Sequence, residues 1–204
     1  MSRSRPTTAE TSIPVVLLAE LPGLARSLAA KVRASGFSPN VIVYIETGAR
    51  LLAHELAAAM DLPLQSIRVQ RGGFGAKRFF APMLRCLPVS VRDALRRLEE
   101  ATGIHRVTSR KIQARLEGLS AGSRVLLVDD AADTGRTLDA ARSAIATCGV
   151  AANDIRAAVL AVTTAAARLS VDFFLFERNC RMPWSADSPE RSEAEERAAG
   201  LLRP

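Results

Sequence analysis

The chain has 204 residues and a mass of 21.9 kDa, and 48% of its residues are apolar while 24% are charged. This balance is typical of one globular domain, and it excludes a chain that is disordered throughout, a collagen and a coiled coil. No apolar run approaches the roughly 20 residues of a membrane span, and no secretory apolar core is found near the start. We therefore expect a cytoplasmic protein without membrane contact.

The formal net charge of +7 is unevenly distributed along the chain. Twelve Lys or Arg and three acidic residues lie between Arg68 and Arg115, which gives this segment a net charge of +9. Such a surplus indicates an anionic partner, either a multiply phosphorylated small molecule or a nucleic acid, and a solvated basic helix face is the alternative. The spacing of Cys86, Cys148 and Cys180 fits neither a disulfide framework nor a zinc site, so reduced, mostly buried thiols are expected.

Helical and strand patterns alternate after a polar leader, residues 1–12, that is expected to be disordered. Helices are predicted at Leu21–Ser35, Ala49–Met60, Val91–Ala101 and Thr137–Cys148. Strands are predicted at Val41–Ile45, Gln65–Gln70, Arg124–Val128, Ile155–Val162 and Val171–Phe176. The strand Val41–Ile45 is apolar at every position, as in strands that are buried on both faces of a parallel sheet. The order predicts an α/β fold with a doubly wound, mostly parallel sheet.

Two segments depart from this alternation. Residues 71–120 open with Gly72, Gly73 and Gly75 and contain one convincing helix, so we interpret them as an excursion from the sheet. From Ser185 the sequence mixes acids and arginines at helical spacing, which predicts a solvent-facing helix or a disordered tail over residues 185–204.

The stretch VLLVDDAADTGRTL, residues 125–138, carries the strongest chemical signal. Four apolar residues lead to the carboxylates of Asp129 and Asp130, and Asp133 follows three residues later. Thr134, Gly135, Arg136 and Thr137 then lead into a helix. Amides at a glycine turn and a helix N-terminus, together with two hydroxyls and a guanidinium, form a cradle for a phosphate. The adjacent carboxylates suit ribose hydroxyls or a magnesium ion. A simple helix cap explains any one of these residues but not the whole string.

This string resembles the phosphoribosyl diphosphate motif of the type I phosphoribosyltransferases. The resemblance implies that Thr134, Gly135, Arg136 and Thr137 hold the 5′-phosphate, and that Asp129 and Asp130 meet the ribose hydroxyls. Asp129 and Asp130 are also the candidate ligands of Mg²⁺, directly or through water, and the substrate alone is the alternative. In members that use purines the third acid lies near N7 of the base, so Asp133 is the implied catalytic base as well as a ligand of the substrate. Displacement of pyrophosphate passes through an oxocarbenium-like state, so catalysis rests on positioning, magnesium and one proton transfer.

The family has a second phosphate loop after its first sheet strand. Here that place is IETGAR, residues 45–50, which is similar to the Ile-Glu-x-Arg-Gly form of adenine-using members but without the Arg-Gly pair at its usual place. The resemblance implies that Thr47, Gly48 and Arg50 bind the diphosphate. Glu46 is in the same stretch, and the alternative to a binding role is a structural one, as a helix cap or as an acid at the edge of the core.

The resemblance also implies a domain organisation. The phosphoribosyltransferase domain is expected over residues 13–184, with a flap and helical insertion at 71–120 and a small hood with the base pocket at 165–184. Phe176 and Trp184, the latter in an Arg-Met-Pro-Trp sequence, are the implied base-binding residues, although Trp184 also suits a packing role. Thr163 and Thr164 stand where purine-using members commonly carry Lys.

The sequence thus predicts a Mg²⁺-dependent enzyme that transfers the 5-phosphoribosyl group of phosphoribosyl diphosphate to a nucleobase, with a purine preferred, and releases pyrophosphate. Because members are often dimeric, a homodimer is among the expected partners, whereas nucleic acid is not expected for the enzyme. The alternative is a regulator of the same fold that senses phosphoribosyl diphosphate and binds RNA or DNA through the basic segment. A phosphatase or kinase-like domain is disfavoured because no Walker motif is present.

Overall fold

The computed structural model describes residues 13–46, 48–69 and 112–201. Several predicted features lie outside the described residues: the leader 1–12, the site residue Thr47, residues 71–111 of the insertion with its helix Val91–Ala101, and Cys86.

The other two cysteines are free thiols, and Cys148 is half-buried while Cys180 is buried. Burial raises the pKa of the Cys180 thiol, and the charge of Arg178 only partly opposes this rise.

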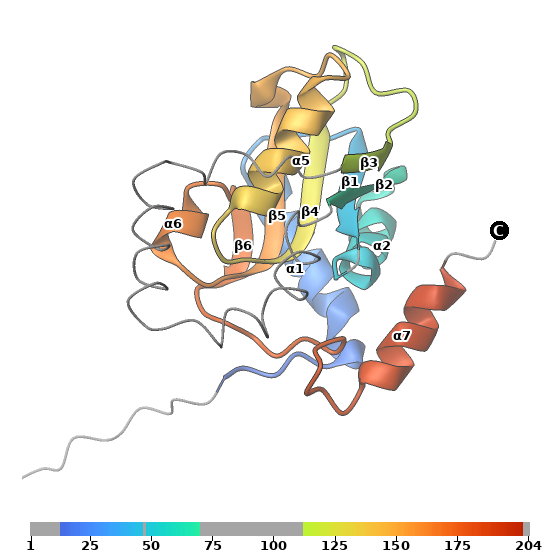
Figure 1. Ribbon diagram of the computed structural model, residues 1–204, viewed down its shortest axis with the longest axis vertical. Helices are drawn as coiled ribbons and strands as arrows, with labels where there is room; N and C mark the ends of the chain where they lie inside the picture. Colours follow the sequence, from blue (N-terminus) through green and yellow to red (C-terminus); the bar gives the residue numbers. More distant parts are fainter. Residues whose placement is uncertain (1–12, 47, 70–111, 202–204) are drawn as a thin grey trace, which may run out of the picture.

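A six-stranded sheet forms the centre of the molecule (Figure 1). Its strands are β1 (Val41–Glu46), β2 (Leu64–Val69), β3 (Ile112–Arg115), β4 (Val125–Ala132), β5 (Ile155–Val162) and β6 (Phe173–Phe176). They lie in the order β3-β2-β1-β4-β5-β6. All neighbours are parallel except β2 and β3, which are antiparallel. The predicted α/β fold with a mostly parallel sheet is therefore confirmed.

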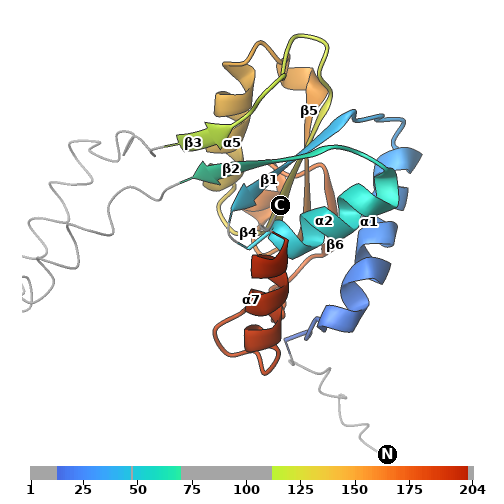
Figure 2. The same ribbon diagram turned by 90° about the vertical axis from the view of Figure 1, so that its right-hand side faces the viewer.

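Helices cover both faces of this sheet (Figure 2). The α-helices are α1 (Leu21–Ala34), α2 (Arg50–Met60), α5 (Arg136–Ala146), α6 (Ala165–Arg168) and α7 (Arg191–Gly200), and two short 3₁₀ turns are η1 (Leu18–Glu20) and η2 (Ala152–Asp154). Buried residues of α1 and α2 share one core with the sheet, and buried residues of α5 share the other. None of the helices in these described ranges is long and apolar enough to cross a membrane.

The two central strands explain why both cores form. In β1 the five residues Val41–Ile45 are all buried, and in β4 the four residues Val125–Val128 are completely buried. Because side chains alternate along a strand, Leu126 and Val128 enter the core with α1 and α2, while Leu127 enters the core with α5. The continuous apolar runs of the sequence are thus explained by burial on two faces.

Several predicted boundaries are wrong. Strand β4 does not end at Val128 but continues through Asp129 and Asp130 to Ala132, because β5 pairs with it along this length. Within the predicted insertion 71–120, residues Ile112–Arg115 form β3 and pair with β2, so the sheet resumes before residue 120. The mixed sequence of β3 gives no strand signal of its own, and its pairing with β2 defines it.

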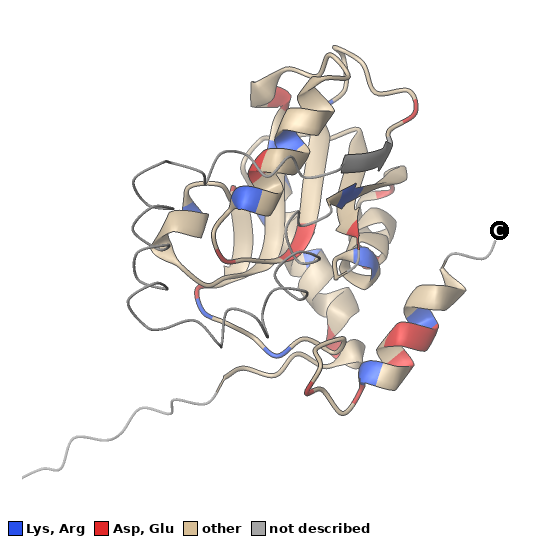
Figure 3. Ribbon diagram, viewed as in Figure 1, with Lys and Arg blue, Asp and Glu red and all other residues tan. Residues whose placement is uncertain are grey.

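The two ends of the described chain are joined to the domain and to each other. Val15 pairs with Arg181, and Val16 N donates to Arg181 O at 2.9 Å. The Glu190 carboxylate accepts a hydrogen bond of 2.8 Å from Leu18 N. Helix α7, which carries both acidic and basic residues along its length (Figure 3), buries Ala194 in the core with α1 and α2. The segment predicted as a tail therefore contributes packing to the domain.

Candidate functional site

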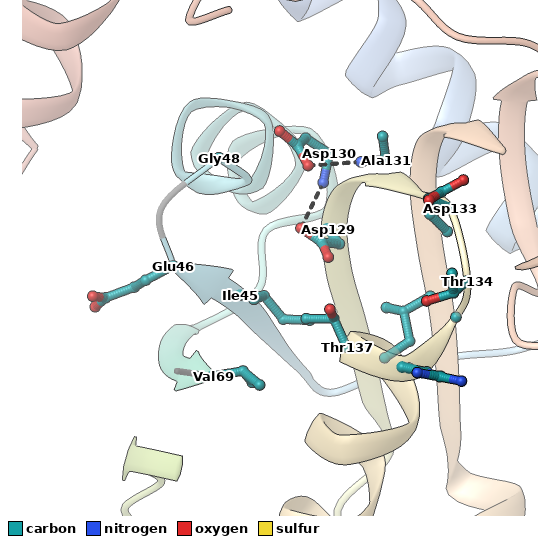
Figure 4. Close-up of a pocket in the computed structure, with 14 residues that line it drawn as sticks. Ile45, Glu46, Gly48, Val69, Asp129, Asp130, Ala131, Asp133, Thr134 and Thr137 are labelled. Carbon is teal, nitrogen blue, oxygen red and sulfur yellow. Dashed lines mark hydrogen bonds between the residues drawn. The ribbon is translucent and has the colours of Figure 1, made fainter. Parts of the chain in front are cut away.

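A cavity of about 570 Å³ opens where β1 and β4 end (Figure 4). It is lined by Ile45, Glu46, Gly48, Val69 and residues 129–138. The carboxyl ends of parallel strands meet at this edge of the sheet, which is where open α/β sheets bind ligands. The predicted site residues that line this cavity are Gly48 and the whole stretch from Asp129 to Thr137.

The two adjacent acids are presented to opposite faces of β4. Asp129 is only 9% exposed and its Oδ1 accepts a hydrogen bond of 2.9 Å from Asp130 N. Asp130 is the next residue of the strand, so its side chain lies on the other face of β4. Its Oδ1 accepts a hydrogen bond of 2.7 Å from Ala131 N. Figure 4 shows the Asp130 side chain directed toward Gly48, away from the Asp129 side chain. The acid pair thus offers oxygens in two directions rather than one.

The loop after β4 has the geometry of an anion cradle. Gly135 has φ +72°, the left-handed conformation that glycine adopts without strain, and α5 begins at the next residue. A Cβ at this position would also overlap the Ser170 side chain. Thr134, Arg136 and Thr137 line the cavity beside it. The first turn of a helix directs N–H groups outward, and these groups and the dipole at the start of α5 favour a negative ligand here.

Asp133 is held by the neighbouring strand end. Its Oδ1 accepts a hydrogen bond of 2.8 Å from Thr163 Oγ1, and its carbonyl accepts one of 2.5 Å from Thr164 Oγ1. Thr164 also caps α6 by accepting a hydrogen bond from Ala167 N. Thr163 and Thr164 therefore orient the third acid of the motif. The position of Thr163 and Thr164 directly after a predicted strand was the signal that could have revealed this contact.

Glu46 closes another side of the cavity but is directed away from the acid pair (Figure 4). Its Oε2 accepts hydrogen bonds from Arg68 Nε at 3.0 Å and Arg68 Nη2 at 2.7 Å. Burial alone would raise the pKa of Glu46, but hydrogen bonds from Ser66 and Arg68 and the charges of Arg68 and Arg50 lower it below its usual value. The contacts with Arg68 hold the Glu46 carboxylate at the edge of the sheet.

Arg50 does not line this cavity. It lies in a second cavity of about 440 Å³ together with Trp184 and residues of α7, and its Nη1 donates to Ala198 O at 3.3 Å. The side chain is 9% exposed, and its Nε has no hydrogen-bond partner among the described residues. Arg50 is therefore directed toward α7, and the predicted contact with the diphosphate would require it to turn.

The predicted base-binding residues also lie apart from one another. Phe176 is half-buried against the core with α1 and α2, and neither cavity includes it. Trp184 lines the second cavity, and its Nε1 donates a hydrogen bond of 2.8 Å to Asp130 Oδ2. Sequence reasoning did not foresee this contact, because the two residues are 54 positions apart.

The family model of the phosphoribosyl transferase domain matches residues 18–193 of this sequence, which is most of the chain. The chain belongs to the phosphoribosyl transferase family. This membership, together with the position of the motif, confirms the predicted family and supports a transferase. A comparison with curated proteins found no match.

Solved structures similar to this phosphoribosyl transferase domain include two purine-using enzymes. A purine phosphoribosyltransferase from Pyrococcus horikoshii is 21% identical with a TM-score of 0.56, over 84% of this chain and 92% of that one. A xanthine-guanine-hypoxanthine phosphoribosyltransferase from Helicobacter pylori is 16% identical with a TM-score of 0.55, over 85% and 92%. A hypothetical protein from Neisseria gonorrhoeae, solved with bound ppGpp, is 16% identical with a TM-score of 0.55, over 96% and 100%. At these identities the similarity shows the fold.

Proposed function

We propose that this phosphoribosyl transferase domain transfers the 5-phosphoribosyl group of phosphoribosyl diphosphate to a purine base and releases pyrophosphate. One observation carries the proposal: the acids of β4 and the glycine loop at the start of α5 line the same cavity. A phosphate on the cradle at residues 134–137 would place the attached ribose beside the carboxylates of β4. The named purine-using structures of the same fold support the choice of acceptor.

Asp129 and Asp130 are the residues we assign to Mg²⁺. Within the described part of the chain, no group of three or more His, Cys, Asp or Glu side chains is arranged to hold a metal ion. Because the two carboxylates are directed to opposite faces of β4, each would reach the ion separately, directly or through water, and the ion would take its remaining ligands from water and from the substrate, as magnesium commonly does. When bound, Mg²⁺ would neutralise charge on the leaving pyrophosphate.

Asp133 is the residue we assign to the proton transfer. In the reaction the bond from C1′ to pyrophosphate breaks with its electron pair, a bond from C1′ to a base nitrogen forms, and the proton on the base is lost. Thr163 already donates to Oδ1 of Asp133. We therefore assign the proton to Oδ2, which the same hydrogen bond keeps in a fixed orientation.

Pyrophosphate release tests this function. The purified protein is mixed with Mg²⁺ and phosphoribosyl diphosphate, and adenine, hypoxanthine, guanine and xanthine are added one at a time. We expect release with one or more of these bases and none when Mg²⁺ is removed with a chelator. If no base gives release, calorimetric titration with phosphoribosyl diphosphate distinguishes two explanations. Binding without turnover favours the regulatory alternative, and absence of binding contradicts the assignment of the cavity.

The Asp133→Asn variant tests the catalytic role. Loss of a general base lowers kcat by about a hundredfold, while the affinity for phosphoribosyl diphosphate measured by calorimetry should change much less. Thr163→Val is the matched control: it keeps the Asp133 carboxylate, removes the hydroxyl that donates to Asp133 Oδ1 and to Ala132 O, and should have the smaller effect. Full turnover by Asp133→Asn would contradict the role.

A further inference from the structure

The carboxylate of Asp130 is enclosed by groups from three separate parts of the chain. Its own β4 supplies the Ala131 N–H to Oδ1 at 2.7 Å. The segment before α7 supplies the Trp184 indole N–H to Oδ2 at 2.8 Å. Both oxygens thus accept a hydrogen bond from the protein, and each bond has a length typical of a charged acceptor.

Gly48 lies against the Asp130 carboxylate and is the third part of the chain that encloses it. A Cβ built on Gly48 would overlap Oδ2 of Asp130 and also approach its carboxyl carbon at 2.7 Å. The close approach of this carboxylate by itself excludes a side chain at position 48. The carboxylate is therefore confined between the start of α2 and the indole ring.

Trp184 is itself held in place by the domain. It packs against the core with α1 and α2, and it shares the second cavity with Gly48, Arg50 and α7. Its N–H is used by Asp130, so the polar edge of the ring faces the cavity acid and not an open surface. The indole thus connects the C-terminal segment to the predicted substrate site.

We infer that Trp184 is a positioning residue that fixes the Asp130 carboxylate in the orientation required to bind phosphoribosyl diphosphate. The inference rests on the proposed function, since it assigns Asp130 to that ligand. Without the indole N–H, Asp130 can rotate, and part of its hydrogen-bonding capacity turns to water. Binding of the ribose and its metal must then reorder the carboxylate, so affinity decreases while the chemical step on bound substrate is little affected.

Trp184→Phe tests the inference because it keeps an aromatic ring and removes the N–H. We expect the Kd and KM for phosphoribosyl diphosphate with Mg²⁺ to rise about tenfold, and kcat to change by less than about twofold. Tyr44→Phe is the matched control: it removes the hydroxyl from another ring of the same core, one whose ring contact is with His54, and it should leave affinity unchanged.

A double-mutant cycle separates positioning from packing. If Trp184 acts through Asp130, Trp184→Phe has no further effect on affinity in an Asp130→Ala background, where binding is already weakened. If it only packs, the effects of the two substitutions add. Additivity overturns the inference, as does a wild-type Kd for Trp184→Phe. Wild-type protein that does not bind phosphoribosyl diphosphate at all contradicts the proposed function instead.

Two further measurements remain informative if Trp184→Phe does not fold. Replacement of Trp184 by benzothienylalanine keeps the shape of the indole and removes only the N–H, and it should reproduce the tenfold loss of affinity. Trp184 is the only tryptophan among the 204 residues, so the tryptophan fluorescence of the protein reports on the surroundings of this one side chain. Emission should change when Asp130 is replaced by Ala, and unchanged emission overturns the inference.

Discussion

Gly135 illustrates how one residue serves both folding and binding. Its left-handed φ of +72° and the adjacent Ser170 side chain both exclude a Cβ. Gly36, which follows α1, has a similar φ of +77°, but a Cβ added there would meet no atom of the described residues within 4 Å. A substitution at Gly36 therefore tests backbone strain alone, whereas a substitution at Gly135 tests strain and crowding together.

We expect Gly36→Ala to lower the free energy of unfolding by about 1 kcal/mol, because an L-residue in the left-handed region costs about this amount. Gly135→Ala should cost more, because Ser170 must also move, and it should weaken binding of phosphoribosyl diphosphate. Urea denaturation and calorimetry measure the two effects. Equal loss of stability and unchanged affinity in Gly135→Ala would show that the loop does not form the cradle.

His54 on α2 makes stability depend on pH. Burial lowers its pKa below 6.5, the charge of Arg50 lowers it further, and Glu55 opposes the shift. The unfolded chain therefore takes up a proton at higher pH than the folded protein does. Stability from this residue is complete above about pH 6.5 and is lost as the pH falls through the lower, folded-state pKa.

The expected result is a decrease in the free energy of unfolding between pH 7.5 and pH 5.5, of which part is absent in His54→Gln. Urea denaturation at both pH values measures it. An identical decrease in His54→Gln would mean that other groups are responsible, such as the carboxylates that titrate at still lower pH.

At the scale of elements, Asp172, which precedes β6, connects this strand to β5 and α5. Its carboxylate accepts hydrogen bonds from Arg142 Nη2 of α5 at 2.6 Å and from Ala157 N of β5 at 2.7 Å. Arg156 contributes a third, at 3.2 Å. Because these donors come from different elements, Asp172 fixes the positions of β6 and α5 relative to β5.

We expect Asp172→Ala to lower the free energy of unfolding by about 2 kcal/mol, because it leaves the Ala157 N–H without its side-chain acceptor and the partly buried Arg142 with only the Ser170 carbonyl. Glu177→Gln is the matched control, since its ion pair with Arg168 is mostly exposed and should contribute less than about 1 kcal/mol. Thermal and urea unfolding compare the two variants. Equal effects would show that Asp172 is no more than a surface charge.

At the scale of the whole molecule, α7 completes the domain rather than extending from it. Ala194 is 1% exposed, Glu190 binds Leu18 N, and Arg50 donates to the carbonyl of Ala198. These contacts link the C-terminal segment to the beginning of the described chain and to α2, which lies next to the cavity.

Truncation after residue 189 should therefore lower Tm by about 5 °C or more, because it exposes the core beside Ala194 and leaves Arg50 without its acceptor. Glu193→Gln in the full chain is the control, since this side chain is 56% exposed and paired only within α7. Calorimetric unfolding of both proteins measures the difference. An unchanged Tm after truncation would show that α7 is dispensable.

The sequence by itself determined the sheet class and the motif. Continuous apolar runs such as Val41–Ile45 require burial on two faces, and the string from Asp129 to Thr137 carries its chemistry in consecutive residues. Local patterns of this kind depend only on neighbours along the chain, so they can be read without coordinates.

Only the tertiary structure decided which distant residues complete the site. Trp184 reaches Asp130 across 54 positions, and Arg50 reaches Ala198 across 148. Strand β3, too, is defined by its pairing with β2. A hydrogen bond between remote residues leaves no periodicity or composition in the sequence, because its geometry depends on how whole elements pack.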